Sequence, residues 1–319
     1  MKAIGGYFGL DSRNEPHYHN EAMRFNAARK ALEFLLKQSE YTRIHIPAYC
    51  CASLLEAFVN SRKEYSIYHI DGSLEITSLP QLSEGEAILY VNYFGVKNNY
   101  VKTLYRKYGY RLIVDNSQAF FDFPVAADCS TFYSPRKFFG VADGGYLYAD
   151  AISKDIPKED TSYDRMQHLL RRIDQSPEDG YKQFQLCEES LSQRPVLAMS
   201  RITSSILGNI DYQRVKAIRQ KNFTALHREL NALNQLDLTD VNSQVAPMVY
   251  PLLTEASSLR KKLIDNRVFV AQYWPRTIGK LKKDTDEFRL QHNLIPLPLD
   301  QRYNEVDMSY IVRIIRSCI

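Results

Sequence analysis

One lysine in this sequence stands in a setting that suits covalent chemistry. Lys137 lies within the stretch "FYSPRKFFGVADGG" (residues 132–145), between short polar residues and a double glycine. Such neighbours are typical of a lysine held inside a cleft, where its amine can act as a nucleophile towards a carbonyl group. A lysine without such a role is usually a solvated surface side chain, and the residues alone leave both interpretations open.

An aspartate that precedes Lys137 in the chain could complete such a site. Asp115 ends the apolar stretch "RLIVD", which reads as a strand. A carboxylate in a dry crevice can pair with a protonated ring nitrogen. An aspartate after a strand is also a common turn or N-cap residue, so this assignment has a structural alternative too.

The start of a predicted helix could bind an anion. The stretch "FNAARKALEFLLKQ" (residues 25–38) has apolar residues at helical spacing, and Asn26 is a good N-cap. Free amides in the first turn and the positive end of the helix dipole favour a phosphate, which Ala27 and Ala28 would allow to approach closely. Simple capping explains the same residues, so the anion site is a hypothesis at this point.

These three features need a sheet to position them. The first half of the chain alternates strand-like and helix-like stretches, which predicts a mainly parallel sheet with helices on both faces. In such sheets, ligands bind beyond the carboxyl ends of the strands. That rule selects residues 47–51, 92–95 and 115–118 as site-forming loops.

The second half of the chain divides into two parts. Residues 154–236 have a helical pattern, including a long run at residues 201–230, and the composition then shifts to prolines and β-formers. We predict a large α/β domain over residues 1–235 and a small α+β domain over residues 236–319.

Composition excludes several other classes of protein. The net charge of the 319-residue chain is only +4 and its basic residues are spread out, unlike those of a nucleic-acid binder. No apolar run approaches the length of a membrane span, and neither GxGxxG nor GxxxxGK[ST] is present, which argues against a nucleotide-binding protein. Five cysteines without CxxC spacing argue against a zinc site or a disulfide framework and favour a cytoplasmic protein.

The motifs, taken in order, resemble the DegT/DnrJ/StrS sugar aminotransferase family. The similar stretches are "FNAARKAL", "IPAYCCASLLEAF", "VNYFG", "VDNSQAFF", "FYSPRKFFGVADGG" and "MSRITSSILGNIDYQRVKAIRQKN". The resemblance covers nearly the whole chain. It implies the aspartate aminotransferase-like fold of enzymes that use pyridoxal 5′-phosphate, and a homodimer with its site at the interface.

The resemblance also implies roles for single residues. Lys137 would hold the cofactor as a Schiff base, Asp115 would pair with its pyridinium nitrogen and Gln118 would hydrogen-bond its 3-oxygen. The backbone amides of Ala28 and Arg29 would bind its phosphate. A lysine at this position favours amino transfer over the related dehydratases, which have histidine there.

Further residues match the family's cofactor site less closely. Asn26 would cap the phosphate-binding helix and Tyr49 would lie in the turn that lines the cofactor. Cys51 falls where the family commonly has an aromatic residue stacked on the ring. Phe132 falls where it has a phosphate-binding serine, which Ser134 could replace.

The implied activity is the transfer of an amino group from an amino acid, glutamate in our expectation, to a keto-sugar or similar acceptor in polysaccharide synthesis. Because the departures weaken phosphate and ring contacts, two explanations compete. Arg29 or Lys30 could supply the phosphate's counter-charge, or the protein could be a non-catalytic or altered relative that binds the cofactor weakly.

Overall fold

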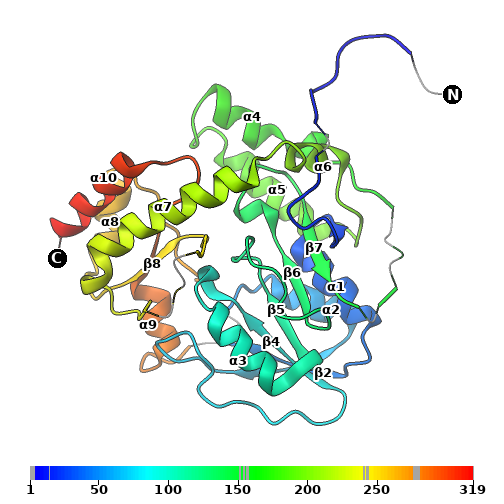
Figure 1. Ribbon diagram of the computed structural model, residues 1–319, viewed down its shortest axis with the longest axis horizontal. Coiled ribbons are helices and arrows are strands. Elements are labelled where there is room, and N and C mark those ends of the chain that lie inside the picture. The colour runs from blue at the N-terminus through cyan, green and yellow to red at the C-terminus, as the bar shows by residue number, and fades with distance from the viewer. Residues whose placement is uncertain are drawn as a thin grey trace.

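The computed structural model describes residues 4–318 apart from residues 14, 151, 154, 156–157, 240, 242–243 and 276–280. Among these residues, one large sheet has the strand order β1-β7-β6-β5-β4-β2-β3 (Figure 1). Its strands are β1 Met23–Phe25, β2 Arg43–Pro47, β3 Glu64–Tyr68, β4 Glu86–Val91, β5 Leu112–Asp115, β6 Ser130–Tyr133 and β7 Gly145–Tyr148. Strands β3, β2, β4, β5 and β6 run parallel to one another, whereas β7 is antiparallel to β6 and β1. The predicted mainly parallel sheet is therefore confirmed.

Helices cover the sheet because its central strands are mostly apolar and fully buried. Every residue of β4 and β5 is buried, as expected for interior parallel strands. The covering helices are α1 Ala28–Gln38, α2 Leu54–Ser61 and α3 Asn98–Tyr108. Leu32, Leu35 and Leu36 of α1 are almost fully buried, and burial of each such side chain stabilises the fold by about 1.5–3 kcal/mol.

The helical segment that follows the sheet is broken more often than its sequence suggested. It contains α4 Gln167–Asp174, α5 Tyr181–Gln193, α6 Arg201–Leu207 and α7 Tyr212–Leu230. The long run at residues 201–230 is thus two helices, because the Asp211 side chain accepts a hydrogen bond from the Arg214 amide and starts a new helix. Gly208 lies in the break, where a Cβ atom would come within 3.1 Å of the Glu15 carbonyl oxygen.

The C-terminal part of the chain packs against α7. Strands β8 Tyr250–Leu253 and β9 Leu294–Leu297 pair antiparallel. Helices α8 Leu259–Asp265, α9 Asp286–Asn293 and α10 Glu305–Arg316 gather beside them, away from β7 and α1 (Figure 1). A capping box between Asn304 and Asp307 starts α10. The predicted boundary after residue 235 stays a prediction.

Short 3-10 helices supply several of the loops: η1 Tyr93–Gly95, η2 Gly109–Arg111, η3 Pro135–Lys137, η4 Tyr163–Arg165 and η5 Asn231–Leu233.

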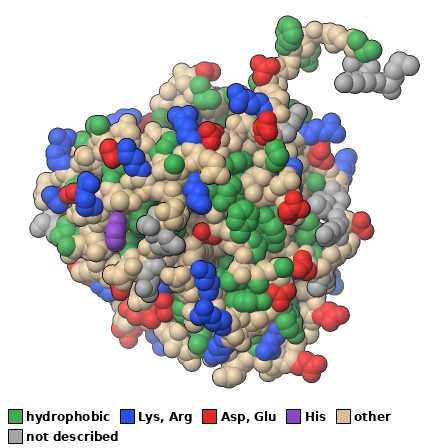
Figure 2. Space-filling model, viewed as in Figure 1, with side chains coloured by type: hydrophobic (Ala, Val, Ile, Leu, Met, Phe, Trp, Pro, Cys, Tyr) green, Lys and Arg blue, Asp and Glu red, His purple; other side chains and the backbone are tan. Residues whose placement is uncertain are grey.

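On the face shown in Figure 2, basic and acidic side chains are interspersed, which agrees with the small net charge. No helix in the described part of the chain has the length and apolarity needed to cross a membrane.

Candidate functional site

The end of β6 carries the lysine that the sequence singled out. After Tyr133 the chain turns through Ser134 into η3, where Lys137 is the last residue. The Lys137 side chain is exposed, but its Nζ atom donates a hydrogen bond to Ser117 Oγ at 2.8 Å. The amine is therefore directed back to the carboxyl end of the neighbouring strand β5.

Asp115 is the last residue of that strand and is buried, with 9% of its surface exposed. Its Oδ1 atom accepts a hydrogen bond from the Ser117 amide at 2.8 Å, so the aspartate does form a turn, as the structural alternative predicted. The same turn places Ser117 between Asp115 and Lys137. Sequence reasoning missed Ser117, although it lies inside the Asp-x-x-Gln motif.

Gln118 is fully buried and keeps one unused hydrogen-bond donor. Its Oε1 atom accepts from the Phe94 amide at 2.8 Å, whereas its Nε2 atom has no partner among the described residues. Phe94 and Gly95 have positive φ values of 58° and 79°. Gly95 is required here because a Cβ atom would approach the Gln118 carbonyl oxygen to 2.9 Å. An unpaired buried amide is costly, and it marks this strand end as a place where a ligand oxygen would fit.

The loop after β2 carries Tyr49 and Cys51, whose place beside the cofactor stays a prediction. Tyr49 is fully buried, and its hydroxyl donates to the Tyr273 carbonyl at 2.9 Å while its ring stacks on Tyr93. Burial raises the pKa of Tyr49 well above its usual value. The side chain of Cys51 is half-buried, with Sγ 3.0 Å from Ser53 Oγ. Tyr49 therefore ties the sheet to the C-terminal part of the chain.

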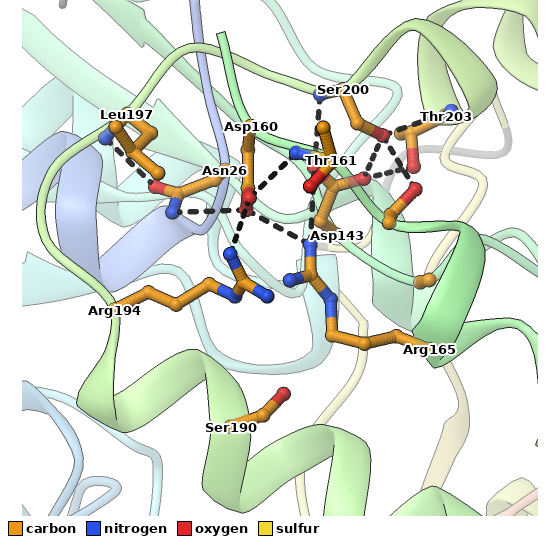
Figure 3. Close-up of polar contacts among 12 residues, drawn as sticks. Asn26, Asp143, Asp160, Thr161, Arg165, Ser190, Arg194, Leu197, Ser200 and Thr203 are labelled. Carbon is orange, nitrogen blue, oxygen red and sulfur yellow. Dashed lines mark hydrogen bonds and ion pairs between the residues drawn. The ribbon is translucent and has the colours of Figure 1, made fainter. Parts of the chain in front are cut away.

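The predicted N-cap role of Asn26 is wrong. Helix α1 begins at Ala28 after Ala27, without a side-chain cap. Asn26 instead directs its side chain towards Asp160 and the loop before α6 (Figure 3), donating to the Pro195 carbonyl at 3.2 Å and accepting from the Leu197 amide at 3.3 Å. Long-range partners outcompete the local cap.

A buried polar network explains where Asn26 goes. Asp160 is paired with Arg165 Nη2 at 2.9 Å and with Arg194 Nη1 at 2.8 Å (Figure 3). Asp143 accepts hydrogen bonds from the amide and hydroxyl of Ser200, each at 2.9 Å, and from the Thr203 hydroxyl. Burial raises the pKa of Asp143 more than these hydrogen bonds lower it. These contacts hold the segment after Lys137 against the start of α6.

The double glycine after Lys137 serves helix α1. A Cβ atom on Gly145 would lie 2.5–2.6 Å from the Ala27 carbonyl group and 2.6 Å from the Ala28 nitrogen. Gly144 has a φ of 122° and its amide donates to the Asn26 carbonyl oxygen at 2.8 Å. The glycines thus allow the start of α1 to pack directly on the strand that follows the lysine loop.

Carboxylates surround the start of α1. Arg29 contacts Glu56 at 3.2 Å and Glu188 at 3.5 Å. The buried Lys30 Nζ lies 2.6 Å from Glu56 and 3.2 Å from Glu33. Burial alone raises the pKa of Glu56, but Lys30, Ser192 and Arg29 outweigh it and lower the pKa. Both side chains are therefore already paired with carboxylates, and their predicted role as counter-charges for a phosphate stays a prediction.

A cavity of about 420 Å³ opens beside Lys137. It lies between the lysine loop, the α4–α5 hairpin and the loop that precedes α10. Its basic lining consists of Arg136, Lys137, Arg172, Arg219 and Arg302. Among the described lining residues, the acidic side chain is Asp300, so the cavity suits an anionic ligand.

Arg219 is the most deeply buried of these cations and was not predicted. It is 1% exposed, donates to the carbonyl oxygens of Pro247 and Met248, and lies over the Phe138 ring. Burial lowers the pKa of Arg219 to about 10. Its Nε atom also donates to Gln301 Oε1 at 3.1 Å. No local motif marks a residue that is brought to the site by the packing of α7.

The structure of this chain is similar to solved structures of sugar aminotransferases, although its sequence is not close to theirs. No protein-family model matches the chain, and no curated protein matches it. The sugar aminotransferase CalS13 from Micromonospora echinospora is 13% identical, with a TM-score of 0.64 over 93% of this chain and 87% of that one. PseC from Helicobacter pylori, an aminotransferase involved in the biosynthesis of pseudoaminic acid, is 16% identical, with a TM-score of 0.60 over 93% and 86%.

A DegT DnrJ EryC1 StrS aminotransferase from Brucella abortus is 14% identical to this chain. Its TM-score is 0.60, over 93% of this chain and 85% of that chain. Solved structures of similar proteins include a form with pyridoxal phosphate and one with the bound cofactor pmp. The chain therefore has the fold of the sugar aminotransferases, as its sequence predicted.

Proposed function

We propose that this protein is an aminotransferase that uses pyridoxal 5′-phosphate to move an amino group from an amino acid, glutamate in the first instance, to a keto-sugar or similar acceptor. The observation that carries the proposal is the contact of Lys137 Nζ with Ser117 Oγ, two residues from Asp115. Ser117 thus contacts both the lysine amine and the buried aspartate, at the strand end where ligands bind in this fold.

The residues at this strand end fit the ring of the cofactor. Lys137 would hold its aldehyde carbon, Asp115 would pair with its ring nitrogen and Gln118 Nε2 would donate to its ring oxygen. The donor of Gln118 is buried and unpaired among the described residues, so a bound oxygen would remove a desolvation cost. When bound, the cofactor supplies the electron sink for the reaction.

The chain's own contribution to catalysis is positioning and proton transfer. The free amine of Lys137 would take the proton from the donor's α-carbon and deliver it to the adjacent cofactor carbon. In the second half-reaction it would carry a proton in the reverse direction, to the former carbonyl carbon of the acceptor. The Ser117 hydroxyl holds the amine at the end of β5. The hydroxyl would thereby keep the proton carrier within reach of both positions.

The basic cavity beside Lys137 is our candidate site for the acceptor. Its volume of about 420 Å³ and the guanidinium groups of Arg172, Arg219 and Arg302 in its lining suit a sugar that carries negative charge. The family resemblance implies a keto-sugar on a nucleotide carrier. A second hollow of about 780 Å³ shares Arg172, Tyr181 and Arg302 with the first, which gives room for such a carrier.

We further propose a cytoplasmic homodimer that acts in sugar or polysaccharide biosynthesis. Large apolar side chains lie exposed on α4 and α5, among them Ile173 at 80%, Tyr181 at 60% and Leu170 at 54%. Exposed apolar groups of this kind commonly mark a protein interface. Size-exclusion chromatography with light scattering tests the dimer.

The alternative is a relative that binds the cofactor weakly or no longer catalyses transfer. Its support is the start of α1, where Glu56 and Glu188 already neutralise Arg29. Such charges oppose the binding of a phosphate. This candidate predicts cofactor binding without any half-reaction.

One spectroscopic experiment separates the two. Purified protein with added cofactor should show the visible band of the lysine-bound form, and glutamate should convert it to the pyridoxamine form. A protein that takes up the cofactor but does not respond to any amino donor would support the alternative. A protein that takes up no cofactor at all would contradict both.

A further inference from the structure

Glu188 of helix α5 lies between the two segments that flank the proposed cofactor site. Its Oε1 atom accepts a hydrogen bond from Arg136 Nη2 at 2.5 Å, and its Oε2 atom accepts from Arg29 Nη2 at 3.5 Å. Arg136 immediately precedes Lys137, and Arg29 is in the first turn of α1. One carboxylate therefore bridges the lysine loop and the helix start.

The two arginines have more hydrogen-bonding capacity than this carboxylate uses. The side chain of Arg136 is 12% exposed, and its Nε atom is buried without a partner among the described residues. A phosphate monoester carries a charge near −2 and three acceptor oxygens. Two guanidinium groups bind it better than they bind a single carboxylate.

Glu188 is ionised at neutral pH and competes as an anion. Burial alone raises its pKa, but the charges and hydrogen bond of Arg136, together with Arg29 and Lys137, outweigh burial and lower the pKa. The influence of Lys137 also means that this carboxylate lies within electrostatic reach of the proposed catalytic amine. An incoming anion would therefore have to displace it.

Displacement is structurally simple. The Glu188 side chain is 37% exposed, so rotation about its own bonds moves the carboxylate into solvent. Helix α5 itself buries Cys187 and Leu191, which pack with Ala142 in a small cluster apart from the main core. Neither a rotation of the Glu188 side chain nor a small shift of α5 requires rearrangement of the large sheet.

We propose that Arg29 and Arg136 form the seat for the cofactor's phosphate, and that Glu188 is an internal anion that occupies this seat until phosphate displaces it. The inference rests on the proposed function and adds a control on cofactor loading to it. It gives Glu188 a role that does not require a non-catalytic protein, while Glu56 stays paired with Arg29 and Lys30.

The test compares Glu188→Gln with a matched control, Glu189→Gln, which removes the same charge from an exposed position on the same helix. The first probe is inorganic phosphate, titrated by calorimetry. We expect Glu188→Gln to bind phosphate about tenfold more tightly than wild type, and Glu189→Gln to bind like wild type. Equal phosphate affinity in the two variants would overturn the inference.

A second probe assigns the seat to the cofactor. Glu188→Gln should gain affinity for pyridoxal 5′-phosphate about tenfold and gain little for pyridoxal, which lacks the phosphate. Equal gains for both molecules would contradict the assignment. If no variant forms the lysine-bound cofactor, the proposed function fails, while the phosphate titration still decides whether the seat exists.

A measurement on the wild-type protein tests the inference even if the Glu188→Gln variant does not fold. Saturating phosphate, compared with chloride at equal ionic strength, should speed hydrogen exchange of the α5 amides because it releases the Glu188 contacts. Unchanged exchange throughout α5, combined with no phosphate binding, would count against the proposal.

Discussion

The two ends of the proposed cofactor site differ in how their polar groups are satisfied. At the ring end, Lys137 lies against the neutral hydroxyl of Ser117, and Gln118 keeps a buried donor unpaired among the described residues. At the phosphate end, Arg29 and Arg136 are both paired with Glu188. The ring end has spare capacity, whereas the phosphate end has already been neutralised by the chain.

This difference separates the capacity for proton transfer from the retention of the cofactor. The groups that we propose for proton transfer are held by strand ends and a turn. In our proposal, retention of the cofactor depends on arginines that are paired with the chain's own carboxylates. A protein of this kind can be chemically competent and still load its cofactor slowly.

The largest effect should come from the ring end. Lys137→Ala removes both the attachment point and the proton carrier, and we expect the rate of amino transfer to fall about a thousandfold or more. Rapid mixing with glutamate measures this half-reaction. Lys182→Ala, at an exposed position of α5, is the control and should react like wild type.

Asp115→Asn should have the next largest effect. The asparagine can still accept the Ser117 amide, but it cannot keep the ring nitrogen protonated, so we expect transfer to slow about a hundredfold. Folding should be nearly unchanged. A fall of similar size in Asp284→Asn, which alters an exposed carboxylate, would show that the effect is not specific to the strand end.

Gln118→Met should weaken cofactor binding more modestly. It removes the unpaired donor and leaves the Phe94 amide without its acceptor, so we expect affinity to fall about tenfold and stability by about 1–2 kcal/mol. Fluorescence titration and urea unfolding measure the two changes. Unaltered cofactor affinity would contradict the role given to the Nε2 atom.

Glu56→Gln should act on stability and leave the ring end intact. The buried Lys30 loses its shorter ion pair, at 2.6 Å, so we expect a loss of about 1–3 kcal/mol at neutral pH. Because the pKa of Glu56 is lowered from 4.5 in the folded state, its contribution is present above that value and disappears as the pH falls below it. Unfolding curves should therefore show wild type and variant converging on acidification. Parallel curves would contradict the pairing.

The sequence predicted the elements that depend on local pattern. The parallel strands and the loops at their carboxyl ends follow from apolar runs that end in polar residues. The sequence also predicted that the loops of Asp115, Gln118 and Lys137 meet, since short loops after neighbouring strands must lie together. The roles of these residues at a cofactor ring stay a prediction.

What the sequence could not predict depends on partners far along the chain. Asn26 does not cap α1, because its side chain hydrogen-bonds to Asp160 and to the Pro195 carbonyl instead. The neutralisation of Arg29 needed Glu188, and the cation Arg219 reached the cavity through α7. These pairings arise from tertiary packing, and no local spacing encodes them.

The most direct test of the central claim is to reduce the cofactor-loaded protein with borohydride and map the modified residue by mass spectrometry. Our account predicts one peptide with the cofactor fixed to Lys137. Finding no adduct there, or finding cofactor scattered over surface lysines such as Lys182, would contradict it.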